Sequence, residues 1–206
     1  MDSTWFVVDD PEEDGEEPWG FDADELAFIS ALQDRAASWR VQSADSVVGR
    51  PEDESFLLVY ISLSDDEHRL VLGEWAVHFH GTHVVAGKVR DQLFNLHRSG
   101  PEFFRASGTV DELADRCGEW FAAILNRPVS RAEWHHAGPR YPVAWHFADS
   151  LKPLVGNGEP REPHSRCVLI RGATEPQEGL HSPLCPGEPV RSGFLSRWRA
   201  GRGDRP

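Results

Sequence analysis

The sequence predicts an α+β protein in which a mainly antiparallel sheet of about six or seven strands packs one face against two helices. Three observations lead to this prediction. Short segments that alternate apolar and polar residues recur through the middle of the chain. Two longer segments repeat their apolar residues at the spacing of an α-helix. Turns containing Gly and Pro separate these segments, and the 206 residues suit one domain with extensions.

The charge distribution divides the chain into three parts. Residues 1–30 hold eleven of the 34 acidic residues and no Lys or Arg, so most of the net charge of −13 lies there. Because so charged a segment has little apolar surface to bury, we expect residues 1–20 to form a disordered acidic arm. Residues 21–172 then form a single α+β domain, and residues 173–206 form a flexible tail rich in Pro, Gly and Arg.

The first predicted helix begins at Asp22, which is a good N-cap residue, and Glu25 follows at the capping-box position. It ends near Arg40. The residues expected to face the core recur at helical spacing: Leu26, Ile29, Leu32, Ala36 and Trp39.

The second predicted helix begins after Thr109, which forms a Thr-x-x-Glu capping box with Glu112. It ends at Arg127, because Pro128 disfavours helix in the residue before it. One apolar stripe runs along it: Val110, Leu113, Cys117, Trp120, Phe121, Ile124 and Leu125.

The strands are predicted from alternation and from turn residues. Residues 56–64 form a buried strand, residues 65–67 a solvated acidic turn, and residues 68–72 the return, with a bulge or bend at Gly73. A hairpin over residues 74–88 turns at Gly81 and Thr82. Further strands are expected at residues 103–107, 129–136, 141–150 and 166–171. Residues 43–54 are expected to form a loop, and residues 90–96 fit either a strand or a short helix.

The hairpin contains the first candidate site, made of His78, His80 and His83. Alternation along a strand places His78 and His80 on one side, and a turn at Gly81 and Thr82 makes His83 a cross-strand neighbour on that side. Three imidazoles with an open position are a typical ligand set for a catalytic metal, and zinc is the ion considered first.

A simpler interpretation of these histidines is favoured. Trp75, Val77 and Phe79 alternate with them and form the obvious core side of the hairpin. The histidines then lie on the solvated face, as polar residues do in a one-sided antiparallel sheet.

The N-terminal arm contains the candidate partner-binding residues. Trp5 and Phe6 begin a short apolar segment, residues 5–8. This segment fits an edge strand or a loose segment, or else a motif that docks on a partner or on the protein's own body. The acidic candidates follow it: Asp9, Asp10, Glu12, Glu13, Asp14, Glu16 and Glu17. A flexible acidic segment attracts basic partners, although it also serves simply to keep a protein soluble.

Common catalytic motifs are absent from the sequence, which has no G-x-G-x-x-G, P-loop, G-x-S-x-G or H-E-x-x-H. Its three cysteines form no C-x-x-C motif. A weaker enzymatic hypothesis is a general-base histidine, with His135 or His136 placed beside His146. A pocket for a small ligand is a further class, with these candidates: Trp75, Trp134 and Trp145.

The expected function is therefore a non-catalytic interaction or regulatory module, inhibitor-like or immunity-like, that binds a protein partner and in particular a basic one. No cofactor is expected. The alternative is a metal-binding protein or metal-dependent enzyme that uses the three hairpin histidines.

The longest apolar run is far shorter than the roughly 20 residues of a membrane span, and no secretory signal is evident. We therefore expect a cytoplasmic protein without a membrane or nucleic-acid partner. Only two of the 21 Lys and Arg residues are lysines, which is typical of a high-GC bacterium.

Overall fold

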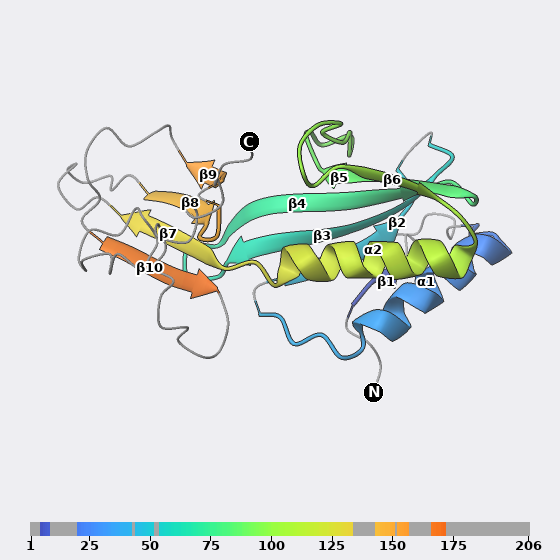
Figure 1. The fold of residues 1–206 in the computed structure, drawn as a ribbon, viewed down its shortest axis with the longest axis horizontal. Coiled ribbons are helices and arrows are strands. Elements are labelled where there is room, and N and C mark those ends of the chain that lie inside the picture. The colour runs from blue at the N-terminus through green and yellow to red at the C-terminus, as the bar shows by residue number, and fades with distance from the viewer. Residues whose placement is uncertain are drawn as a thin grey trace, which may run out of the picture.

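A computed structural model of the chain describes residues 5–8, 20–42, 44–51, 54–133, 143–150, 152–156 and 166–171. The predicted α+β class is confirmed. In these residues two helices accompany a six-stranded mixed sheet and a four-stranded antiparallel sheet (Figure 1). No helix in the described part of the chain is long and apolar enough to cross a membrane.

The six-stranded sheet has the order β1-β2-β3-β4-β5-β6. Its neighbouring strands are antiparallel apart from β1 and β2, which are parallel because helix α1 carries the chain back between them. The strands are β1 (Val7–Val8), β2 (Ala44–Gly49), β3 (Leu57–Asp65), β4 (Leu70–Phe79), β5 (His83–Lys88) and β6 (Phe104–Ser107).

The hairpin between β4 and β5 has the predicted register. Its last pair joins Phe79 to Val84, which leaves the turn at Gly81 and Thr82. Gly81 has a φ of 78°, in the left-handed region that favours glycine. The bulge predicted at Gly73 is also present, because the β3–β4 register shifts between residues 63 and 64, beside this glycine.

Both helices begin as predicted. Asp22 caps α1 (Ala23–Ala36) and Thr109 caps α2 (Val110–Leu125), and each cap forms a capping box with a glutamate three residues later. The helices pack on one another and cover one face of the six-stranded sheet (Figure 1).

Helix α1 differs from its prediction in two ways. It ends at Ala36 rather than near Arg40, and Leu26 is 54% exposed instead of facing the core. The buried stripe is centred on Phe28 and Leu32, both fully buried, so Leu26 lies beyond the edge of that stripe.

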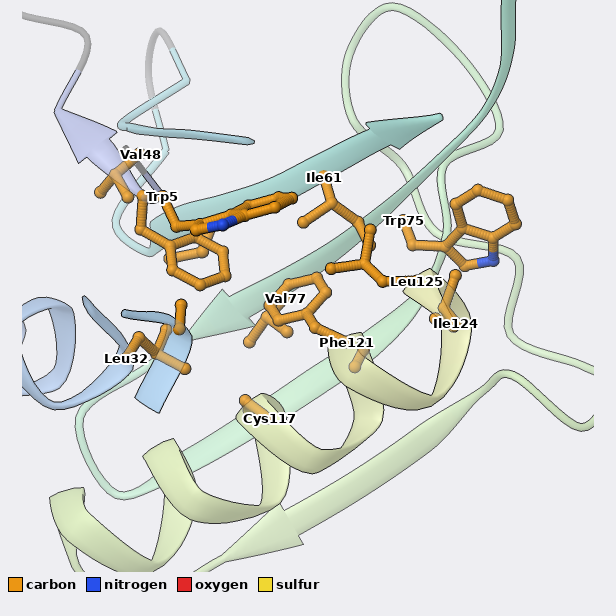
Figure 2. Packing of buried hydrophobic residues seen from close by; sticks show 14 of the residues in the cluster. Trp5, Leu32, Val48, Ile61, Trp75, Val77, Cys117, Phe121, Ile124 and Leu125 are labelled. Atoms are coloured by element: carbon orange, nitrogen blue, oxygen red, sulfur yellow. The ribbon is translucent and has the colours of Figure 1, made fainter. Parts of the chain in front are cut away.

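The main core lies between the helices and the sheet (Figure 2). Trp75, Val77 and Phe79, which the alternation assigns to the core side of the hairpin, are at most 1% exposed. Burial raises the pKa of the Cys117 thiol to about 12, so this cysteine is an unreactive core residue. The opposite face of the sheet carries a smaller buried cluster: Phe56, Leu58, Ala76 and Leu96.

The strands after α2 form a second sheet, whereas the sequence predicts one sheet for all of them. The four strands are β7 (Val129–Glu133), β8 (Val143–Phe147), β9 (Pro153–Gly156) and β10 (Arg166–Arg171), in the order β10-β7-β8-β9. Val129, Trp145 and Phe147 pack into the main core, so this sheet extends the core beyond the end of α2. Alternation identifies a strand, but it does not say which strand lies beside it.

Two strands lie in segments that the alternation pattern does not mark. Residues 43–54, predicted as loop, contain β2, whose six residues include only two adjacent valines and no apolar alternation. β9 is also unpredicted. The undecided segment 90–96 is neither a strand nor a helix, since only an isolated bridge between Val89 and Leu96 orders it.

Residues 5–8 belong to the fold. Val7 and Val8 form the edge strand β1 of the six-stranded sheet. Trp5 is 6% exposed and Phe6 is fully buried, so both side chains are part of the core. The segment is thus an edge strand that also docks on the protein's own body.

Phe6 is held by contacts on several sides. Its ring lies 5.9 Å from the ring of Trp39 and 5.4 Å from that of Phe121, measured between centroids. Its N–H donates to Ser46 Oγ at 2.6 Å, and the Gln33 side-chain amide donates to its carbonyl at 3.0 Å. Its φ of 56° is unfavourable for a bulky residue, so these contacts must outweigh a local strain.

We predict that Phe6→Ala lowers the free energy of unfolding by about 3–5 kcal/mol, because it leaves a cavity in the core. Val7→Ala, at a neighbouring side chain that is 54% exposed, should lower it by less than about 1 kcal/mol. Urea denaturation of the two variants measures both values. Equal small losses would show that the segment does not contribute to the core.

Candidate functional site

The three hairpin histidines lie on one face of the sheet, as the register predicts, and this face is turned away from the helices. The ring of His78 stacks on Phe56 with centroids 3.9 Å apart, and its Nε2 lies 3.0 Å from the carbonyl oxygen of Phe94. Burial lowers the pKa of His78 to about 4, so the ring is neutral at pH 7. Since a carbonyl only accepts, Nε2 donates to it and is not free to bind a metal.

His80 and His83 form an exposed pair at the turn. Their rings are nearly parallel, with an interplanar angle of 5° and centroids 4.6 Å apart. Burial, and then the charge of His83, lower the pKa of His80. The structure therefore brings two of the three histidines into contact and leaves His78 engaged elsewhere. Among the described residues, these three do not form a group with all ligand atoms within 4.8 Å.

The other sequence candidates are only partly described. Trp134, His135 and His136 lie outside the described residues. His146 is 4% exposed on β8. Trp75 is enclosed in the core, so it cannot line an open pocket.

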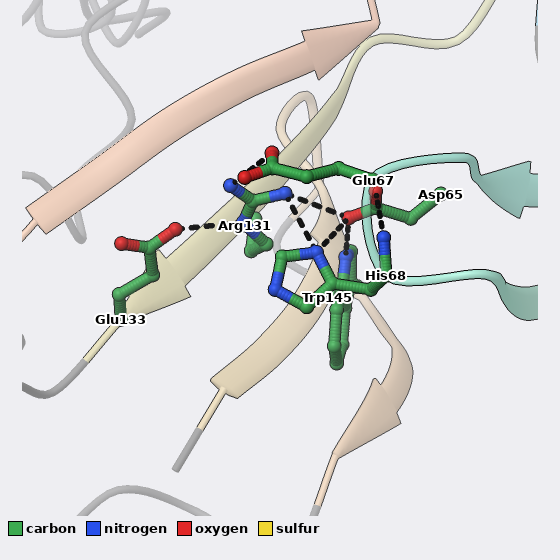
Figure 3. A network of polar contacts seen from close by, with 6 residues as sticks. All are labelled: Asp65, Glu67, His68, Arg131, Glu133 and Trp145. Atoms are coloured by element: carbon green, nitrogen blue, oxygen red, sulfur yellow. Dashed lines mark hydrogen bonds and ion pairs between the residues drawn. The ribbon is translucent and has the colours of Figure 1, made fainter. Parts of the chain in front are cut away.

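A buried polar network joins the β3–β4 turn to the second sheet (Figure 3). Arg131 of β7 is 3% exposed and donates to three carboxylates, at 2.9 Å to Asp65, 2.8 Å to Glu67 and 2.8 Å to Glu133. The indole N–H of Trp145 donates to the same oxygen of Asp65 at 2.7 Å. Asp65 is 4% exposed, so the turn expected to be solvated is in part a buried contact.

Both charges at the centre of this network are stabilised by their partners. Burial by itself raises the pKa of Asp65, but hydrogen bonds from Trp145 and Arg131 outweigh burial and lower the pKa to about 2. Burial by itself lowers the pKa of Arg131, but its hydrogen bonds to carboxylates raise that pKa above its ordinary value. Asp65 and Arg131 are therefore both charged at neutral pH.

Asp65, Glu67 and His68 form a group whose candidate ligand atoms all lie within 4.8 Å of one another. Arg131 already occupies the position that a cation would take. Its Nη1 lies 2.9 Å from Asp65 Oδ2 and 3.0 Å from His68 Nδ1. Because a guanidinium only donates, His68 Nδ1 must accept this hydrogen bond. The group is therefore better explained as a site for arginine than as a site for a metal.

The sequence analysis missed this network. Arg131 and Glu133 are two residues apart on a strand and so share a side, which alternation could have indicated. Their meeting with residues 65–68 depends on how the two sheets pack. A pocket of about 290 Å³ opens beside the network, lined by residues of the β3–β4 turn, by Arg131 and by Val168 and Ile170 of β10.

The acidic candidates of the arm lie outside the described residues, but both ends of their segment are placed. Val8, at the end of β1, pairs with Val48 of β2. Arg50, just after β2, donates to both carboxylate oxygens of Glu25 in the first turn of α1 at 2.7 Å. The end of β1 and the start of α1 therefore lie close together. The acidic residues belong to a connection held at both ends: Asp9, Asp10, Glu12, Glu13, Asp14, Glu16 and Glu17.

The outer side of the neighbouring helices is also acidic. Only Arg35 and Arg116 are basic within the two helices, and Arg35 is paired with Asp115 at 2.5 Å. The exposed acidic residues of the helices are Asp24, Asp34, Asp111, Glu112, Asp115 and Glu119. The helix layer therefore presents a net negative surface next to the acidic connection.

Comparisons of the chain with protein-family models, with curated proteins and with solved structures found no match. The argument about function therefore depends on the residues of this chain alone.

We predict that Arg131→Ala lowers the free energy of unfolding by about 3–5 kcal/mol, because it leaves two buried carboxylates without a counter-charge. Glu67→Gln, at the exposed end of the same network, should cost less than about 1 kcal/mol, since the Glu67 side chain is 72% exposed. Guanidinium denaturation of both variants distinguishes the two effects. A small loss for Arg131→Ala would contradict a structural role for the network.

Asp65 also predicts a loss of stability in acid. Its pKa of about 2 lies below the ordinary value of 3.8, so its contribution is complete above about pH 4 and is lost as the pH falls through 2. The contribution amounts to about 2 kcal/mol. The free energy of unfolding of Asp65→Asn should therefore fall less steeply between pH 4 and 2 than that of the wild type. Parallel pH profiles would rule out this role for Asp65.

Proposed function

We propose that this chain is a non-catalytic interaction module of the bacterial cytoplasm that binds a basic protein partner, in the manner of an inhibitor or an immunity protein. The observation that carries the proposal is the placement of the acidic connection between β1 and α1, beside the acidic outer side of the helices. Because both ends of this connection are held, its seven acidic residues stay within a short distance of that surface.

Two physical effects support a basic partner. A concentration of like charge attracts an oppositely charged protein over a distance of about 10 Å at 0.1 M salt, which raises the rate of association. A connection fixed at both ends also has less conformational entropy to lose on binding than a free arm has. The first effect weakens as salt is added, which makes it measurable.

Binding should depend on the charge of the connection. We compare three baits: the full chain, a variant in which the seven acids of residues 9–17 become Asn or Gln, and a variant with the same residues 9–17 in rearranged order. We expect the full chain to enrich a basic protein from bacterial lysate. The neutralised variant should bind this protein at least about tenfold more weakly, a loss of about 1.4 kcal/mol, and added salt should weaken the wild-type complex.

The rearranged variant is the matched control, because it keeps the charge and changes the order of the residues. It should retain most of the affinity. Circular dichroism and thermal unfolding of all three proteins establish that each is folded. Enrichment of no protein, or equal affinity of the neutralised variant, would contradict the proposal. A rearranged variant as weak as the neutralised one would instead indicate a specific sequence motif.

A further inference from the structure

The two lysines of the chain meet in one cluster, apart from the surface of the proposed interaction. Lys88 ends β5, Lys152 immediately precedes β9, and Glu102 lies just before β6. Lys152 forms an ion pair with Glu102, and the charges of both residues act on Lys88. The remaining basic residues among the 21 Lys and Arg are all arginines. The fold thus gathers its only two ε-amines around one carboxylate.

Lys88 is held differently from Lys152. In the described part of the chain no carboxylate forms an ion pair with Lys88, and its Nζ lies 5.7 Å from the ring centroid of Trp75. Trp75 is its cross-strand neighbour and is fully buried. The Lys88 amine is therefore half-buried against an aromatic ring, with a second cation nearby, and a cation–π contact stabilises its charge less than a buried ion pair does.

This environment favours the neutral amine. Burial lowers the pKa of Lys88, the charge of Lys152 lowers it further, and the charge of Glu102 opposes both effects. Glu102 is shared with Arg127 at 3.1 Å, and Arg127 also pairs with Asp149 at 2.7 Å. Cations nearer than Lys88 therefore match much of the Glu102 charge. An arginine at position 88 would stay protonated, whereas a lysine can lose its proton.

We propose that Lys88 is a nucleophilic amine that condenses with a small aldehyde to form an imine, and that Lys152 is the positioning cation beside it. The lone pair of Nζ attacks the carbonyl carbon to give a carbinolamine. Loss of water from the carbinolamine forms the C=N bond, so that one amine and one aldehyde become one imine and one water. A desolvated lysine beside another cation is an established way to activate an amine. This reactivity goes beyond the proposed interaction and does not depend on it.

Because the chain has only two lysines, each serves as a reference for the other. The folded protein is treated with limiting formaldehyde and sodium cyanoborohydride, which reduces the imine as it forms, and peptide mass spectrometry measures the modification of each lysine. At about pH 7.5 we expect Lys88 to react about fivefold faster than Lys152. In urea the two rates should become equal, because unfolding removes both the burial and the neighbouring charge. A rate at Lys88 no greater than that at Lys152 in the folded protein would overturn the proposal.

Two substitutions at one position separate charge from structure. Lys152→Gln removes the neighbouring cation and frees Glu102, so the rate at Lys88 should fall about threefold. Lys152→Arg keeps the cation and should retain the wild-type rate. An unchanged rate in the Gln variant would also overturn the proposal. If the Gln variant fails to fold, the ratio of the two lysine rates in the Arg variant still decides the matter.

Discussion

A charge buried at the junction of the two sheets governs how the halves of this protein fit together. Arg131 is 3% exposed and cannot lose its proton, so the structure must supply a counter-charge where the guanidinium lies. Asp65 supplies it from the end of β3, and Trp145 fixes the same carboxylate from β8. The β3–β4 turn and the second sheet are therefore matched to one another. A change in the length of that turn would move Asp65 and leave Arg131 without its nearest partner.

The main core imposes a second condition, since it is closed from three directions. The helices cover one face of the six-stranded sheet, and Trp145 and Phe147 extend that core into the second sheet. Trp5 and Phe6 complete it at the edge of the sheet. These two residues looked like candidates for a partner, yet their side chains occupy the interior. What the N-terminal segment offers a partner is therefore charge, and the aromatic residues serve to attach that charge to the fold.

The sequence predicts well those features that depend on a few neighbouring residues. Asp22 and Thr109 begin helices because their side chains reach N–H groups three residues away, and Gly81 fixes the hairpin register because the turn requires a positive φ. It predicts poorly those features that depend on distant residues. The alternation of β7 and β8 reveals strands but not a separate sheet. The Arg131 network and the lysine cluster were out of reach, because their members meet only after folding.

The position of β1 affects how the chain folds during synthesis. Trp5 and Phe6 leave the ribosome before β2 and α2, against which they pack, so they wait without a buried environment while the rest is made. An exposed aromatic and valine-rich segment is prone to aggregate, and charged residues that flank such a segment act as gatekeepers. The seven acids directly after β1 are in the right place for this protection. The same charges would then guard the nascent chain before they meet any partner.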